Sequence, residues 1–218
     1  KKLAQRPEKI ELQDVMWAIR TPKLTGDTAG YGQVVPLFNP SYDNLRMLWH
    51  SPIGAVASPF SPVFMGQTIV PEEFMMHRYL TVGESHRFSD ERKLNEKDRL
   101  SLVSQRVEST VSAVYECKRL LYLILQNKKL FLSATTEIFK DREKKLNDKT
   151  IQILKTTKIL LNKNKKNLCE KILNNFSTTE LKNGLELVQT LSKNMEKHIK
   201  QSKGFTENIK PISLGQIW

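Results

Sequence analysis

Proline is distributed unevenly along this chain of 218 residues, and that distribution constrains the fold more than any other feature. Eight of the nine prolines occur by Pro71, and the ninth is Pro211, which leaves a proline-free stretch of 139 residues. Because proline removes a backbone donor and clashes with the preceding helical turn, long helices are expected only after Pro71. The pattern predicts a mainly α fold with an extended, Pro/Gly-rich N-terminal arm that contains short helices.

The charged residues divide the chain near the same place. Residues 1–88 contain nine basic and eight acidic side chains, residues 89–203 contain 25 and 14, and residues 204–218 contain one of each. The formal charge of +12 therefore belongs almost wholly to the second segment. We interpret residues 1–88 as an interaction arm, residues 89–203 as a long helical segment and residues 204–218 as a C-terminal tail.

Helical periodicity dominates the second segment. Ser89 is a candidate N-cap, and apolar residues then recur mostly at steps of three, four or seven. They are Leu100, Val103, Val107, Val111, Val114, Leu121, Leu125, Leu132 and Phe139. A single helix over residues 90–162 would be a rod of about 110 Å at 1.5 Å per residue. A break near Asn127 or Asp148 would instead fold it into a coiled-coil-like helical hairpin, and both arrangements stay open.

The last helix has an N-terminal signature. Ser177 and Glu180 match the Ser-x-x-Glu capping box, and Phe176 and Leu181 occupy the two positions of a hydrophobic staple. The pattern predicts that this helix begins at Ser177. A turn is expected before it, in the segment "NKNKKN" at residues 162–167.

Short helices are expected in the first segment wherever proline stands near a start. Pro7 suits a first helical position, and the Thr21-Pro22 pair suits the end of the same helix. The scheme is repeated after Pro40 and after Pro71.

The 25 residues from Met47 to Pro71 contain no charged side chain. Four prolines inside this stretch exclude a membrane-spanning helix, which needs about 20 continuous apolar residues. We interpret it as an irregular segment that lies on another protein, since exposed apolar patches usually mark interaction sites. One alternative is a cap on the chain's own helices; a membrane-surface segment is disfavoured because the stretch has no basic residues. The expected partner-binding residues are Trp49, Ile53, Phe60, Phe64 and Ile69.

Residues that could support catalysis are scattered. The four histidines show no paired metal-ligand spacing, and "GESH" at residues 83–86 lacks the G-x-S-x-G pattern of a nucleophile elbow. The glycines at 26, 30 and 32 do not match a phosphate-binding loop. We therefore expect no catalytic residues, no cofactor and no metal site, and a chain that is not an enzyme. Cys117 and Cys169 are expected to be free thiols in a reducing compartment.

The basic surplus suggests RNA as one possible class of partner. Residues 140–171 contain 11 basic and four acidic side chains. No arginine follows Arg142, and aromatic residues are scarce there, whereas specific RNA contacts usually use arginine forks and aromatic stacking. Contact with the RNA backbone through Lys163, Lys165 and Lys166 is accordingly the weaker hypothesis.

An extended arm joined to long helices is typical of accessory subunits in large assemblies. The sequence thus favours a non-catalytic structural subunit that binds other protein subunits, with a mitochondrial respiratory-chain or ATP-synthase complex as the expected setting. A mitochondrial location is expected from three features: the basic balance, the free cysteines and a first residue, Lys1, that is not methionine. The alternative is a mitochondrial ribosomal protein that contacts ribosomal RNA through its lysine-rich helices. No transmembrane segment is expected, and a position close to a membrane stays open.

Overall fold

The chain folds into a mainly α structure with a small sheet near its N-terminal region. The computed structural model describes residues 10–21, 31–37, 40–75 and 112–203. Its helices are α1 (Leu12–Ile19), α5 (Ala113–Gln126), α6 (Lys128–Asn162) and α7 (Lys166–Lys203), with 3₁₀ turns η1 (Asp43–Leu45) and η2 (Glu72–Phe74). Its strands are β1 (Gly32–Val34), β2 (Met47–Ser51) and β3 (Ser61–Phe64).

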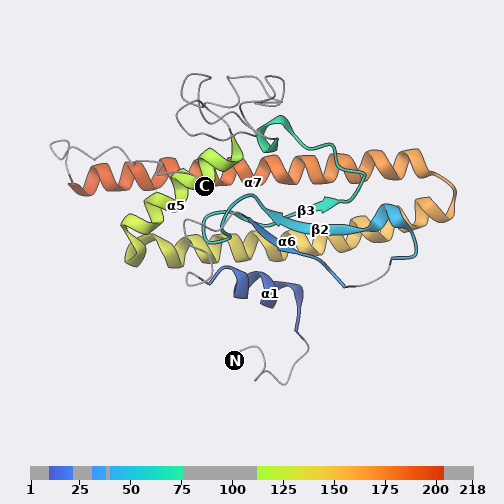
Figure 1. Cartoon of the computed structure of the whole chain (residues 1–218), viewed down its shortest axis with the longest axis horizontal. Helices are drawn as coiled ribbons and strands as arrows, with labels where there is room; N and C mark the ends of the chain where they lie inside the picture. Colours follow the sequence, from blue (N-terminus) through green and yellow to red (C-terminus); the bar gives the residue numbers. More distant parts are fainter. Residues whose placement is uncertain (1–9, 22–30, 38–39, 76–111, 204–218) are drawn as a thin grey trace, which may run out of the picture.

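Two long helices form the frame of the molecule. α6 has 35 residues and α7 has 38, which at 1.5 Å per residue gives lengths of about 50–57 Å. They lie side by side in Figure 1 and are joined by Lys163–Lys165, within the segment where a turn was predicted. Asn164 adopts a left-handed conformation with φ of 57°, which asparagine tolerates better than most residues.

The predicted start of the last helix at Ser177 is wrong. α7 begins at Lys166, and Ser177 is a buried residue inside this helix, so it is not an N-cap residue. The helix extends upstream because Cys169 and Leu173, spaced four residues apart, are buried and continue the apolar face. Glu180 does not close a capping box; it lies 3.5 Å from Arg142 of α6.

A break at Asn127 separates α5 from α6, so residues 90–162 do not form one rod. Asn127 has φ of −135° and ψ of 52°, outside the helical region, whereas Asp148 lies within α6. Ser112 caps α5 by accepting a hydrogen bond from the backbone N–H of Tyr115 at 3.3 Å. The expected helix start at Ser89 lies outside the described residues.

The N-terminal region contains a sheet that the sequence patterns did not predict. Its strands are antiparallel in the order β1-β2-β3, with Gly32 opposite Ser51 and Met47 opposite Phe64. Alternate residues of β2 are buried, which directs Trp49 toward the helices. A Cβ at Gly32 would lie 3.1 Å from the ring of Phe60, so a larger residue here would have to push that ring aside by a few tenths of an ångström.

The short helices were predicted with mixed success. α1 ends at Ile19, just before the expected stop at Thr21, but Pro7 lies outside the described residues and Glu11 occupies the N-cap. The segment after Pro40 forms only η1 and then strand β2, and the segment after Pro71 begins with η2.

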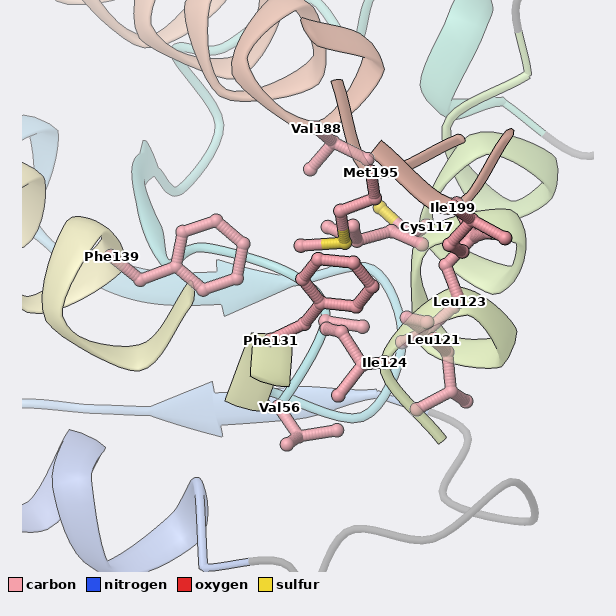
Figure 2. Close-up of a cluster of buried hydrophobic side chains, with 13 residues drawn as sticks. Val56, Cys117, Leu121, Leu123, Ile124, Phe131, Phe139, Val188, Met195 and Ile199 are labelled. Atoms are coloured by element: carbon pink, nitrogen blue, oxygen red, sulfur yellow. The ribbon is translucent and has the colours of Figure 1, made fainter. Parts of the chain in front are cut away.

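Two hydrophobic clusters join these elements. In the first, side chains of α5, α6 and α7 surround Phe131 and Met195, together with Val56 from the N-terminal region (Figure 2). The second packs the sheet and α1 against Leu146 and Leu173 of the long helices. Residues from both sides of the predicted boundary at Phe88 and Ser89 therefore share cores, although the boundary itself lies outside the described residues.

Among the helices that the structure describes, none is both long and apolar enough to cross a membrane.

Candidate functional site

Four of the five expected partner-binding residues are buried in this chain. Trp49, Ile53, Phe60 and Phe64 are at most 2% exposed and pack into the two clusters described above. Their interpretation as anchors on a partner's surface is therefore corrected: they contact the chain's own helices, as in the alternative of a cap. Ile69 differs, because its side chain is 70% exposed.

The backbone around Ile69 is fixed even though its side chain is free. The Ile69 N–H donates to Oδ1 of Asn174 at 2.7 Å, and its carbonyl accepts from Oγ1 of Thr178 at 3.3 Å. Both partners lie on α7, so the apolar side chain is held outward at a defined position.

A buried ion pair fastens the N-terminal region to α6. Arg20, directly after α1, and Glu143 of α6 are each 2% exposed. Nη1 of Arg20 donates to Oε2 of Glu143 at 2.9 Å, Nη2 donates to Oε1, and Nε donates to the carbonyl of Ala55 at 2.7 Å. The guanidinium also lies 5.7 Å and 5.5 Å from the ring centres of Phe60 and Phe139. This bidentate arrangement joins segments that are 123 residues apart.

The neighbouring residue, Arg142, also links α6 to the N-terminal region and, in addition, to α7. Its Nη1 donates to the carbonyl of Phe60 at 2.9 Å, and its Nη2 donates to the carbonyl of Glu180 at 2.7 Å. The N–H of Phe60 in turn donates to Oε1 of Glu143 at 2.8 Å. Burial lowers the pKa of Arg142, and the nearby Glu180 and Glu143 carboxylates oppose that shift. Consecutive residues of α6 thus bind both backbone polar groups of Phe60.

This cluster could have been noticed in the sequence. Glu143 falls between Phe139 and Leu146 at steps of four and three, on the apolar face of the helix. A carboxylate in that position must be paired when it is buried. The dense run of charges around it instead resembled a solvated helix face.

A small pocket is lined in part by side chains with reactive groups, among them His50, Ser58 and Cys117. Its volume is about 10 Å³, roughly the size that admits one water molecule. Burial raises the pKa of Cys117 to about 12, so this residue is a thiol at neutral pH and not a nucleophilic thiolate. Burial also lowers the pKa of His50. The pocket is too small for a substrate.

Both cysteines are free and buried, as expected for thiols outside a disulfide. In the described part of the chain, no three residues among its histidines, cysteines and carboxylates are grouped so as to hold a metal ion.

Aliphatic side chains are exposed around the sheet. Leu37 is fully exposed, and Val35 and Met65 are more than half exposed. These residues border an open hollow of about 530 Å³, whose lining also includes Pro36, Pro40, Arg46, Met47 and Leu48. A second hollow of about 360 Å³ begins at Pro40 and reaches α6, where it is lined by Ile151, Leu154, Lys155 and Lys158, together with Ser41 and Leu45.

The three lysines expected to make electrostatic contacts surround the turn between the long helices. Lys163, Lys165 and Lys166 are all exposed, and Lys166 lies 3.8 Å from Glu170. The second hollow approaches this turn because Tyr42 donates a hydrogen bond to Oδ1 of Asn162 at 2.6 Å. The lysines and the hollows therefore belong to one end of the helix pair.

Comparison of the chain with protein-family models, with curated proteins and with solved structures finds no match.

Proposed function

We propose that this chain is a non-catalytic structural subunit of a large multiprotein assembly. The supporting observation is the group of exposed aliphatic side chains that border one hollow, with Leu37 fully exposed and Val35 and Met65 more than half exposed. Exposed aliphatic side chains grouped on one region of a protein are typical of surfaces that become covered by another protein.

The internal construction supports a scaffold role. The buried pair Arg20–Glu143 and the contacts of Arg142 hold the sheet region on a helical frame about 50 Å long. Side chains on such a frame keep fixed relative positions, which reduces the conformational entropy lost on assembly.

The setting we propose is a mitochondrial respiratory-chain or ATP-synthase complex. Two features support this setting: the excess of basic over acidic residues, and the two free cysteines. The helix pair is proposed to serve as a hairpin-like strut within the complex, with other protein subunits as its partners.

A mitochondrial ribosomal subunit is the second candidate. The exposed position of Lys163, Lys165 and Lys166 at the helix turn favours it, because these ammonium groups could approach RNA phosphates. The aliphatic character of the nearby hollows favours the protein assembly instead, since the described residues that line them include no aromatic side chain on which a base could stack.

The decisive experiment is purification of the tagged full chain from its native source, followed by sedimentation across a salt series with and without nuclease. We expect the chain to sediment with other proteins, to resist nuclease and to be insensitive to replacement of Lys163, Lys165 and Lys166 by Gln. Replacement of Ile69 by Ser should reduce its retention, whereas the matched change at Leu130, which is 52% exposed on α6, should not.

Two outcomes would contradict the proposal. A chain that sediments alone under gentle conditions is not a subunit of an assembly. A chain released by nuclease, with a salt slope that the triple lysine variant flattens by about two to three units, is held by RNA and fits the ribosomal candidate.

A further inference from the structure

We propose that the two adjoining hollows form a docking site for an acidic segment of a neighbouring protein. Apolar side chains of that segment would fill the hollows, and its carboxylates would pair with Lys155 and Lys158. This inference rests on the proposed function and adds the chemistry of the partner.

The walls of the site are held in place by the chain itself. Tyr42 binds Asn162 at 2.6 Å, and Nδ2 of Asn44 donates to Glu170 at 3.4 Å, which ties the loop after Pro40 to both long helices. The Met65 N–H donates to the carbonyl of Arg46 at 2.8 Å, which fixes the other wall. A partner would thus meet a preformed surface, which lowers the cost of binding.

The lining is aliphatic and large enough for side chains of a partner. Val35, Leu37 and Met65 border the first hollow, and Ile151 borders the second with 43% of its surface exposed. Their volumes, about 530 and 360 Å³, lie within the range of about 300–1,000 Å³ found for binding pockets. Pro40 lines both, so one continuous segment could occupy the two hollows.

The proposed negative charge of the partner is based on two lysines at the second hollow that have no ion-pair partner among the described residues. Lys155 and Lys158 are exposed at the second hollow, and neither has an ion-pair partner among the described residues. Arg46 at the first hollow is already paired with Asp43 at 2.8 Å. Two other lysines of α6 do have acids: Lys145 pairs with Asp141 at 2.7 Å, and Lys149 lies 3.5 Å from Glu180 of α7. The two cations beside the aliphatic lining are thus available to carboxylates of a partner.

The spacing of the lysines defines the carboxylates that fit. Residues three apart on a helix have Cβ atoms about 5–6 Å apart on the same face, and Ile151 lies four residues before Lys155 on that face. A segment with two carboxylates at a similar separation, next to apolar side chains, matches this pattern. An RNA strand would use the lysines but leave the aliphatic lining uncovered.

The test is photo-crosslinking within the native assembly. The tagged full chain is produced with p-benzoylphenylalanine at Leu37, and a control chain has the same group at Leu130, which lies far from the hollows. After irradiation the cross-linked peptide is identified by mass spectrometry. The proposal expects a peptide from another subunit with net negative charge, obtained from position 37 and not from position 130.

A charge-reversal pair sharpens the result. Lys155→Glu with Lys158→Glu should lower the yield of that cross-link by about tenfold, because attraction to the carboxylates becomes repulsion. Lys128→Glu with Lys129→Glu makes the same change of charge at the opposite end of α6, about 45 Å away, and should change the yield less than twofold. Unfolding of each variant in urea shows whether its fold is retained.

Several outcomes would overturn the inference. These are a cross-link to RNA, to a neutral or basic peptide, to a second copy of this chain, or no cross-link from position 37. If the chain nevertheless sediments with the assembly, the proposed structural role survives and only the docking site is rejected. If the chain is not part of any assembly, the proposed function itself has failed.

Discussion

The two ends of the α6–α7 pair use their charged residues differently. At the end near α5, comprising residues 128–146 and 178–203, some charged side chains form ion pairs that join separate elements of the fold. Arg20 with Glu143 and Arg119 with Glu196, at 2.7 Å, are examples. At the turn end, comprising residues 147–177, Lys155 and Lys158 are exposed without an ion-pair partner among the described residues.

This contrast shows two uses of the same residue types. At the α5 end, Arg20 and Glu143 form an internal ion pair whose geometry is fixed by burial. At the turn end, the ammonium groups of Lys155 and Lys158 remain in water, where they cost little to keep and are available to a partner. A basic composition alone does not distinguish these uses; the positions of the acids do.

The strongest test of the contrast is removal of the buried carboxylate. Glu143→Gln should lower the free energy of unfolding by about 3–5 kcal/mol, because the Arg20 guanidinium would stay buried without its counter-charge. Lys158→Gln at the turn end should change that free energy by less than about 0.5 kcal/mol. Urea unfolding followed by circular dichroism measures both.

A second variant shows whether the loss comes from the unpaired charge. Combining Glu143→Gln with Arg20→Met removes the cation, while the amide introduced at position 143 still offers an acceptor to the N–H of Phe60. The double variant should recover much of the stability lost in the single one, since apolar replacement of a buried pair is often close to neutral. Equal destabilisation of the single and double variants would mean that packing, not charge, dominates at this site.

Local chemistry explains what could be predicted from the sequence. The turn at residues 163–165, the break at Asn127 and the end of α1 before Thr21 all depend on nearby asparagine or proline. The exclusion of a membrane-spanning helix between Met47 and Pro71 rests on its prolines in the same way. These signals act within a few residues, so a sequence is enough to recognise them.

Long-range packing explains what could not be predicted. Each strand of the sheet has only three to five residues, and β2 pairs with two partners that are separate in sequence. The bidentate pair of Arg20 and Glu143 spans 123 residues, so no local pattern indicates it. The long helices also bury Thr135, Thr150 and Thr157, whose hydroxyls donate to carbonyls four residues earlier. Polar residues on the core face weaken the apolar stripe by which a helix is recognised.

A loss of stability of intermediate size is expected when a side chain is added at Gly184, where α7 lies close to the sheet. A Cβ at Gly184 would lie 3.3 Å from both Nη2 of Arg142 and Oγ of Ser61, and 3.5 Å from Cγ of Pro59. Gly184→Val should cost about 1–3 kcal/mol, because the branched side chain must displace these neighbours. Asn175→Val, at an exposed position of the turn end, is the matched control and should change stability by less than about 0.5 kcal/mol. A Gly184→Val chain as stable as its control would show that this packing is loose.

The smallest expected effect tests whether α7 is one helix through both ends of the pair. Ser177 lies where the two ends meet, and its buried Oγ has no hydrogen-bond partner in the described structure. Ser177→Ala should therefore raise stability by up to about 0.5 kcal/mol, because alanine is the better helix former. Ser112→Ala is the matched control: its hydroxyl accepts from the N–H of Tyr115, so its loss should cost about 1 kcal/mol. The two serine changes thus have opposite expected signs in the same urea experiment. A cost of about 1 kcal/mol at Ser177 would indicate a helix start there, as the Ser-x-x-Glu pattern suggests, and the turn end would then no longer belong to the same continuous helix as the α5 end.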